Sequence, residues 1–265
     1  GERVDLWNKN VNKPIDFVVG DLLNHRLLYD VLESFKPDTI IHYAEQPSAP
    51  YSMKDREACY FTQHNNVLGT INLLFGMKKH CPDAHLIKLG TMGEYGTPNI
   101  DIEEGWLEIT HKGRKDRVLY PKKPMSFYHL SKVHDSNNIE FACRVWGTKC
   151  TDLNQGCVYG LETEESKMDE KMSTSFHYDQ VFGTVINRFI CQSIIGKDLT
   201  VYGNGTQTRG YLNIIDTLNC VNIATNNPAS TGEFRVFNQY TEVLSINDIA
   251  KNIISAASQS LKLKI

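Results

Sequence analysis

Short apolar runs alternate with helical patterns along the first 155 residues, and this alternation constrains the fold more than any other feature. Runs rich in β-branched and aromatic residues predict strands over 17–21, 39–43, 85–90 and 150–153. Apolar residues at helical spacing predict helices over 27–35, 66–79 and 126–145. Strand, helix and strand at these intervals are typical of βαβ units. We therefore expect an α/β fold with a doubly wound parallel sheet, covered by helices on both faces.

The pattern becomes looser after about residue 160. The charged run over 162–171 is most simply a solvated loop. Two short strands are predicted over 199–202 and 233–237, and a helix over 247–258. We expect residues 1–160 to form the main sheet domain and residues 161–265 a smaller mixed α/β region, packed on the ligand edge of the sheet.

Charge and cysteine usage exclude several classes of protein. The net charge is −3, whereas nucleic-acid binders usually carry a basic excess, so we expect no nucleic acid. No apolar run approaches the roughly 20 residues that span a bilayer, so we expect no membrane span. The seven cysteines are scattered and form no CxxC pair, which argues against a zinc site and a disulfide framework. We therefore expect no metal.

Polar residues follow each predicted strand of the main sheet. In parallel sheets, ligands gather at the carboxyl ends of the strands. The candidates for ligand contact are therefore Asp21, His42 to Gln46, Thr91 to Tyr95, Asn154 and Gln155.

The sharpest chemical signal is Tyr128 with Lys132 on a predicted helix. Residues four apart share a helix face, so the Tyr128 phenol should lie beside the Lys132 ammonium. A neighbouring cation stabilises a phenolate and lowers its pKa, so the pair could act as a general base near neutral pH. Thr91 adds a hydroxyl at the end of a predicted strand. The alternative is a structural threonine with a surface Tyr–Lys pair, and we favour the catalytic interpretation.

Thr91, Tyr128 and Lys132 together resemble the catalytic triad of the extended short-chain dehydrogenase/reductases. The segments 38–42, 66–70 and 203–209 look like landmarks of the nucleotide-sugar epimerases and dehydratases of that group. Within it, the resemblance is to a branch that builds a sulfonated sugar nucleotide. The segments that carry this resemblance are 45–53, 62–66, 88–105, 127–136, 152–156 and 207–212.

The resemblance implies a Rossmann-type sheet that binds NAD in residues 1–160 and a UDP-sugar-binding region in residues 161–265. The residues it places on the cofactor are Asp21, Tyr43, Ala44, Asn66, Leu89, Tyr128 and Lys132. The residues it places on the substrate are Gln46, Thr91, Asn154, Gln155 and Arg209. The catalytic residues would be Thr91, Tyr128 and Lys132, with His129 and Glu45 as candidates for further proton transfers.

The family pattern has two departures here. The glycine-rich phosphate loop and the acidic residue that holds the adenosine ribose are absent, and both would precede Gly1. We therefore expect a partial domain that lacks its first strands, an internal piece of a longer protein. Met92 and Gly93 stand where the 4,6-dehydratases carry an acid and a base directly after the threonine. This argues against an ordinary 4,6-dehydratase and leaves a 4-epimerase open.

The reaction implied by the resemblance begins with UDP-glucose. Oxidation at C4 acidifies the C5 proton, water leaves across C5 and C6, sulfite adds at C6, and C4 is reduced again. The alternative enzyme is a UDP-glucose 4-epimerase or another nucleotide-sugar epimerase/dehydratase. A different class is a redox-sensing or scaffold protein that has lost turnover. We also expect a homodimer, located in the chloroplast stroma if the source is a photosynthetic eukaryote and otherwise in the cytoplasm.

Several single residues keep a structural alternative. Asp21 could cap the helix that begins near Asn24. His129, which can change charge near neutral pH, could be a histidine packed on the sheet. Arg209 could be a surface arginine, although its guanidinium can fork onto a diphosphate. For the strand end at 42–46 and for Asn66, packing or capping is an equal alternative. We expect Glu94 to satisfy local backbone donors.

Overall fold

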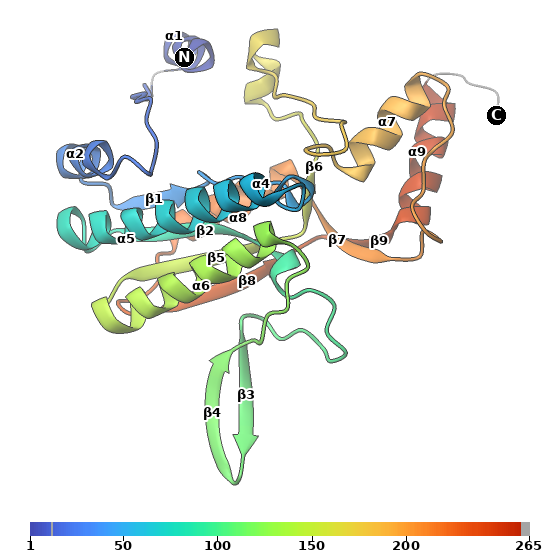
Figure 1. Cartoon of the computed structure of the whole chain (residues 1–265). Coiled ribbons are helices and arrows are strands. Elements are labelled where there is room, and N and C mark those ends of the chain that lie inside the picture. Colours follow the sequence, from blue (N-terminus) through green and yellow to red (C-terminus); the bar gives the residue numbers. More distant parts are fainter. Residues whose placement is uncertain (12, 261–265) are drawn as a thin grey trace.

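The computed structural model describes residues 1–11 and 13–260 of the chain. Four parallel strands form its central sheet, in the order β1-β2-β5-β8 (Figure 1). Their bounds are Thr39–His42 for β1, His85–Thr91 for β2, Lys149–Gln155 for β5 and Phe234–Gln239 for β8. All three neighbouring pairs are parallel. Ligands therefore belong at the shared carboxyl edge, where Thr91, Gln155 and Gln239 lie in register.

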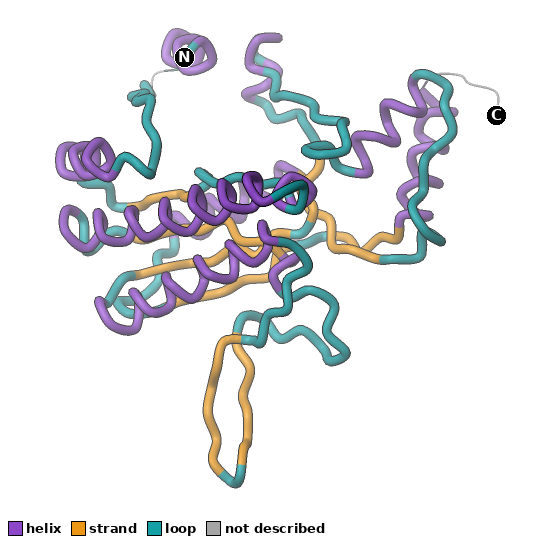
Figure 2. Tube along the Cα trace, viewed as in Figure 1, coloured by secondary structure: helices purple, strands orange, loops and turns teal. Residues whose placement is uncertain are grey.

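Helices cover both faces of this sheet, as the alternation of the sequence predicts. On one face Leu86 packs with Leu73 of α5 (Gly69–His80) and Ile139 of α6 (Phe127–Trp146). On the other face Ile87 packs with Val221 of α8 (Ile214–Asn226). Neighbouring residues of one strand thus serve opposite cores, since side chains alternate along a strand. The doubly wound α/β class is confirmed (Figure 2).

The remaining helices and turns lie outside the central sheet. α2 (His25–Phe35) begins at Asn24, whose side chain caps the helix by accepting from the backbone N–H of Leu27. The other elements before β2 are α1 (Glu2–Asn10), α3 (Ala49–Ser52), α4 (Arg56–Gln63) and the π-helical turn η1 (His64–Leu68). The short 3₁₀ turns are η2 (Met92–Glu94), η3 (Glu165–Lys167) and η4 (Glu170–Met172). In the part of the chain covered by the structure, no helix is long and apolar enough to cross a membrane.

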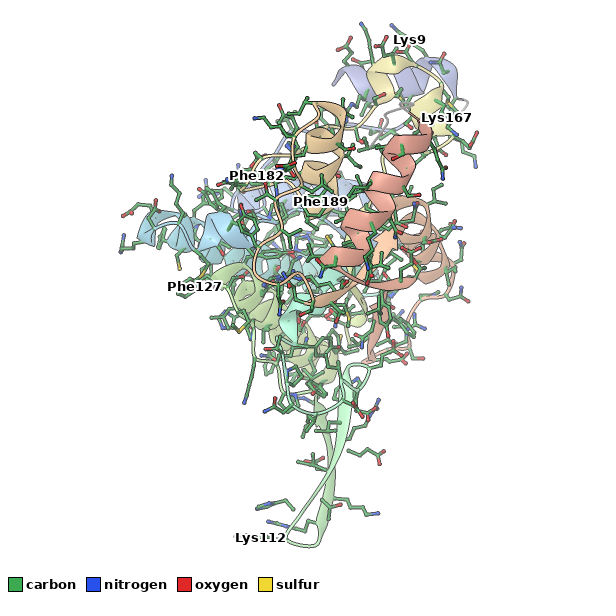
Figure 3. The ribbon with its side chains drawn as sticks, turned by 90° about the vertical axis from the view of Figure 1, so that its right-hand side faces the viewer. Lys9, Lys112, Phe127, Lys167, Phe182 and Phe189 are labelled. Carbon is green, nitrogen blue, oxygen red and sulfur yellow. The ribbon has the colours of Figure 1, made fainter. Side chains whose placement is uncertain are left out.

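A smaller unit lies beside the carboxyl edge of the sheet. Its three strands are β6 (Cys157–Tyr159), β7 (Thr208–Asn213) and β9 (Glu242–Ser245), in the order β6-β7-β9. The helices α7 (Val185–Ile194) and α9 (Ile246–Ser260) pack together around a buried cluster of Phe189, Tyr211, Ile246 and Ile249. Figure 3 shows Phe189 within this helical pair. The predicted helix over 247–258 is thereby confirmed.

A two-stranded hairpin projects from the body of the protein (Figure 1). It consists of β3 (Trp106–His111) and β4 (Arg114–Leu119), and Lys112 lies at its far tip (Figure 3). The two turn residues, Lys112 and Gly113, both have positive φ angles, as the tight hairpin turns that match strand twist require. Nothing in the alternation of the sequence predicted this arm.

Three strand predictions need correction. Residues 17–21 form no strand, and Phe17 and Val19 are 58% and 81% exposed, because the segment pairs with no neighbouring strand. Residues 199–202 also form no strand, since Leu199 and Val201 pack as irregular chain against the core of the smaller unit. The strand predicted over 233–237 exists as β8, but it pairs with β5 in the main sheet. The division of the chain at residue 160 stays a prediction. One strand of the range 161–265, β8, belongs to the sheet of the range 1–160.

Candidate active site

Thr91 ends β2 and begins the η2 turn at the carboxyl edge of the sheet. Its hydroxyl accepts a hydrogen bond from the backbone N–H of Gly93 at 3.1 Å, which caps the turn. The predicted position of this hydroxyl, at the end of a buried strand, is confirmed. Its orientation is therefore fixed by the turn that follows it.

Tyr128 and Lys132 lie in the first turns of α6, which starts at the capping residue Ser126. The Ser52 hydroxyl accepts from the backbone N–H of Tyr128 at 3.0 Å and joins α3 to this helix end. The Lys132 ammonium is buried and reaches back to the sheet, where it donates to the carbonyl of Leu89 at 2.7 Å. Lys132 therefore lies in the interior and Tyr128 is half-buried, so the alternative of a surface pair is wrong.

Glu45 is the second partner of Lys132, with 2.7 Å between Oε1 and Nζ. Burial raises the pKa of this carboxyl, whereas the Lys132 ammonium and His42 lower it. The lowering effects together are larger, so the pKa of Glu45 is below its usual value. The nearby Asp135 behaves in the opposite way, because burial and the Glu45 charge raise its pKa well above the usual range. The two buried carboxyls therefore differ, since the pKa of Glu45, which pairs with Lys132, is lowered and the pKa of Asp135 is raised.

The expected direction of the Tyr128 pKa is wrong in this structure. Lys132 does lower it, as predicted, but burial raises it more and Glu45 adds to the increase. The physical reason is the burial of the phenol, while the Glu45 carboxylate, 2.7 Å from the Lys132 ammonium, opposes the effect of that ammonium. Tyr128 is therefore a phenol here, and any event that separates Lys132 from Glu45 would make it more acidic.

His129 packs over Gly93, next to the catalytic turn. Its Nδ1 lies 2.9 Å from the Ser126 hydroxyl, and its ring contacts that of Tyr128 with centroids 4.9 Å apart. A Cβ on Gly93 would lie only 2.2 Å from His129 Nε2. Burial and the charge of Arg209 lower the pKa of His129 to about 4, so the ring is neutral near pH 7. The missing side chain at position 93 thus makes room for a neutral imidazole.

One cavity of about 730 Å³ brings three predicted residues together, namely Tyr128, His129 and Arg209. Arg209 comes from β7 of the smaller unit and is exposed to this cavity, so the cavity lies between that unit and the start of α6. Arg188 and Gln207 also line this cavity, and neither is among the residues predicted from the sequence. Arg188 is the charged residue of the otherwise largely apolar helix α7, and this contrast could have indicated a functional role.

A second cavity of about 560 Å³ lies above β1 and the start of α2. It is lined by four predicted residues, Asp21, Ala44, Glu45 and Gln46, together with Gly20 and Asn65. Asp21 accepts from the backbone N–H of Leu23 at 2.9 Å, whereas the cap of α2 is Asn24. The capping alternative for Asp21 is therefore wrong, and its second oxygen remains available to a ligand.

The other predicted contact residues lie at the site with different degrees of access. Asn66 is fully buried and holds the chain at Gln46, since its side chain bonds both the N–H and the carbonyl of that residue. Asn154 donates to the Tyr95 hydroxyl at 3.1 Å, and Gln155 to Gln239 at 3.3 Å. Tyr43 is 55% exposed, and Leu89 contributes its backbone carbonyl to Lys132. All five remain predicted ligand contacts.

Glu94 has a different partner set from the expected one. Its carboxylate binds the ammonium groups of Lys88, at 3.0 Å, and Lys122, and it is completely buried. The expectation that it satisfies local backbone donors is wrong. A lysine inside the apolar strand 85–90 was the signal for a buried counter-charge, because an unpaired ammonium is almost never fully buried.

The parallel sheet, the Thr91 turn and the Tyr128–Lys132 pair define a Rossmann-type short-chain dehydrogenase/reductase. Residues 2–238 match the NAD dependent epimerase/dehydratase family, and the chain belongs to that family.

Two curated relatives are named UDP-sulfoquinovose synthase. The chloroplastic protein of Spinacia oleracea is 56% identical over 263 residues, which cover 99% of this chain and 54% of that protein. The protein of Sulfolobus acidocaldarius is 40% identical over 265 residues, which cover 100% of this chain and 67% of that protein. The chain thus spans about half the length of its spinach relative.

Solved structures support the fold. The UDP-glucose 4-epimerase of Thermotoga maritima superposes with a TM-score of 0.71 at 20% identity, covering 95% of this chain and 71% of that one. The UDP-glucuronic acid 4-epimerase of Bacillus cereus, solved with UDP-glucuronic acid and NAD, gives 0.69 at 22% identity, covering 98% and 70%. At these identities the likeness is one of fold.

Proposed function

We propose that this chain belongs to a UDP-sulfoquinovose synthase, which converts UDP-glucose and sulfite to UDP-sulfoquinovose with tightly bound NAD. The observation that carries the proposal is the 56% identity to the spinach enzyme over 99% of this chain. The position of Lys132 supports it, because its buried ammonium is held at Leu89, two residues before Thr91.

The residues at the smaller cavity fit a dinucleotide. The Gln46 Nε2 atom and the second Glu45 oxygen are buried without a hydrogen-bond partner, and both residues line the cavity with Asp21. Asp21 would accept from an adenine amino group, and Tyr43, Ala44, Asn66 and Leu89 would line the path to the Tyr128–Lys132 pair. When bound, NAD supplies a reversible hydride acceptor. Lys132 would leave Glu45 for a ribose hydroxyl, and this exchange would lower the pKa of Tyr128.

The larger cavity would hold the UDP-sugar. Arg209 would bind the diphosphate, and Asn154 and Gln155 would contact phosphate or sugar hydroxyls. Gln46 would contact the sugar from the side of the smaller cavity. Tyr128 would take the proton from the sugar 4-hydroxyl, and Thr91 would hydrogen-bond the same oxygen. In the structure Asn154 and Gln155 bind other side chains, so ligand binding would have to compete with these partners.

Glu45 and His129 are the two candidates for transfer of the C5 proton, and they lie in different places. Glu45 lines the smaller cavity, where the cofactor would bind, and does not line the larger one. His129 lines the larger cavity and is neutral. Its Nε2 occupies the space that a side chain at position 93 would fill. We therefore assign the C5 proton transfer to His129 and the support of Lys132 to Glu45.

Incubation of the full-length protein with UDP-glucose, with and without sulfite, tests the proposal. Mass spectrometry should show a sulfonated sugar nucleotide only when sulfite is present. Formation of UDP-galactose under both conditions would instead assign the chain to the 4-epimerases. We further propose a homodimer, and a chloroplast location if the source is a photosynthetic eukaryote, because the spinach relative is chloroplastic. Otherwise we propose a cytoplasmic location.

A further inference from the structure

A cluster of buried charges lies directly beneath the candidate active site. It consists of Lys88, Glu94, Lys122, Ser136 and Asp152, which we call the buried charge cluster. The side chains of Lys88, Glu94 and Asp152 are 0% exposed, and that of Lys122 is 4% exposed. Two ammonium groups face two carboxylates, so the cluster is neutral as a whole.

Lys88 is the centre of this cluster. Its ammonium lies 3.0 Å from Glu94 Oε1, 2.8 Å from Ser136 Oγ and 3.2 Å from Asp152 Oδ2. It also lies 3.1 Å from the backbone carbonyl of Lys132. Three protons are thus shared among four acceptors, and these acceptors come from η2, α6 and β5. One side chain of β2 therefore fixes three other elements at once.

The Ser136 hydroxyl closes the cluster. It lies 3.0 Å from Glu94 Oε2 and 2.9 Å from Asp152 Oδ2, in addition to its contact with Lys88. Burial alone would raise the pKa of Glu94, but the ammonium groups of Lys88 and Lys122 lower it to about 2. The carboxylates of Asp152 and Glu94 in turn raise the pKa of Lys88 against the effect of burial. Glu94 and Lys88 therefore keep their charges near neutral pH.

Stability alone is a poor reason for such a cluster. Replacing a buried ion pair by packed apolar side chains is often neutral or stabilising, since desolvation offsets the attraction. Fixed geometry is a better reason, because every tie ends close to a catalytic or contact residue. Glu94 is three residues after Thr91, Ser136 is one turn after Lys132, and Asp152 is two residues before Asn154.

We infer that Lys88 and its buried cluster are positioning groups, which hold the Thr91 turn and the Tyr128–Lys132 helix at the separation that proton transfer from the sugar requires. The inference rests on the proposed function, because it assumes that Thr91 and Tyr128 act on one hydroxyl. It concerns residues that touch neither substrate nor cofactor. A displacement of about 1 Å in such an arrangement can cost on the order of 10²-fold in rate.

Two variants of the full-length protein test this inference. Ser136→Ala removes the closing hydroxyl with a small loss of volume, and Asp152→Asn keeps the shape and removes one charge. Asn137→Ala is the matched control, since Asn137 is exposed on the same helix. Single-turnover absorbance at the reduced nicotinamide band measures hydride transfer, and calorimetry measures the Kd for UDP-glucose. A substrate deuterated at C4 reports whether chemistry limits the rate.

We expect hydride transfer to slow by at least about tenfold in either variant. The Kd should stay within about twofold of wild type, and the isotope effect should increase. If Ser136→Ala does not fold, Asp152→Asn alone decides. Hydride transfer within about twofold of wild type in a folded variant would overturn the inference and leave the cluster a purely structural role. Absence of hydride transfer in the wild-type protein would instead refute the proposed function, so the two failures are distinguishable.

Discussion

Gly93→Ala should disable the C5 proton transfer without touching the C4 chemistry. The new Cβ would lie 2.2 Å from His129 Nε2 and 2.4 Å from Cδ2, whereas ordinary contacts begin at 3.4 Å. The ring must therefore retreat by roughly 1 Å, a displacement that can lower a rate on the order of 10²-fold. Because Nδ1 lies 2.9 Å from the Ser126 hydroxyl, that hydrogen bond must lengthen or break. The overpacking should also cost about 1–3 kcal/mol of unfolding free energy.

The assay separates the two chemical steps. Incorporation of solvent deuterium at C5, followed by mass spectrometry, should fall on the order of 10²-fold in Gly93→Ala. Absorbance of the reduced nicotinamide should show C4 oxidation close to the wild-type rate. Gly69→Ala is the matched control, since its Cβ would meet Leu22 at an ordinary 3.4 Å.

A double variant tests the steric cause. Gly93→Ala with His129→Ala should recover most of the lost unfolding free energy, because the clashing ring is gone, and C5 exchange should remain absent. Wild-type C5 exchange in Gly93→Ala would refute the assignment of His129. Glu45 would then become the leading candidate for this proton.

Three further results are expected. Tyr128→Phe should abolish formation of the sulfonated product while retaining UDP-glucose binding, because one oxygen is lost and the ring still packs; wild-type turnover would contradict this. Arg209→Ala should weaken UDP binding by roughly 1.5–3 kcal/mol in calorimetric titration, and unchanged affinity would place the diphosphate elsewhere. Burial lowers the pKa of His42, His85 and His129 to about 4. Below the unfolded-state pKa of about 6.5 the unfolded chain binds more protons, so unfolding free energy should fall from pH 6.5 to 4, by at most about 1.4 kcal/mol per pH unit for each histidine. Urea titrations of wild type and His85→Gln should differ in this slope, and equal slopes would exclude His85.

The alternation of strands and helices along the chain could be predicted because each segment carries its own period. Leu86 and Ile87 illustrate the two-faced burial that makes 85–90 readable as a parallel strand. The segment 17–21 is also rich in apolar residues and still forms no strand, since a strand depends on a partner that local sequence cannot supply. For the same reason, the sequence of β8 predicted a strand but could not predict the sheet that it joins.

The positions of Thr91, Tyr128 and Lys132 could be predicted, but their electrostatic state could not. The spacing of Tyr128 and Lys132 places them on one helix face, which is a local property. Burial of Tyr128 reverses the expected direction of its pKa, and Glu45, which pairs with Lys132 from 87 positions away, adds to this effect. Lys88 shows the same limit, since its four acceptors come from segments that only the fold brings together.

The interleaving of the two units has a mechanical consequence. The polypeptide passes from the parallel sheet to the smaller unit between β5 and β6, returns between β7 and α8, and passes over again between β8 and β9. Opening of the cleft between the units would have to bend three connections together, two of which flank Gln155 and Gln239. A single proteolytic cut at one crossing would leave the halves joined by the other two. The connections thus hold the cleft together near Gln155 and Gln239. A bound sugar nucleotide should therefore be released on the other side, near Arg209 and Gln207.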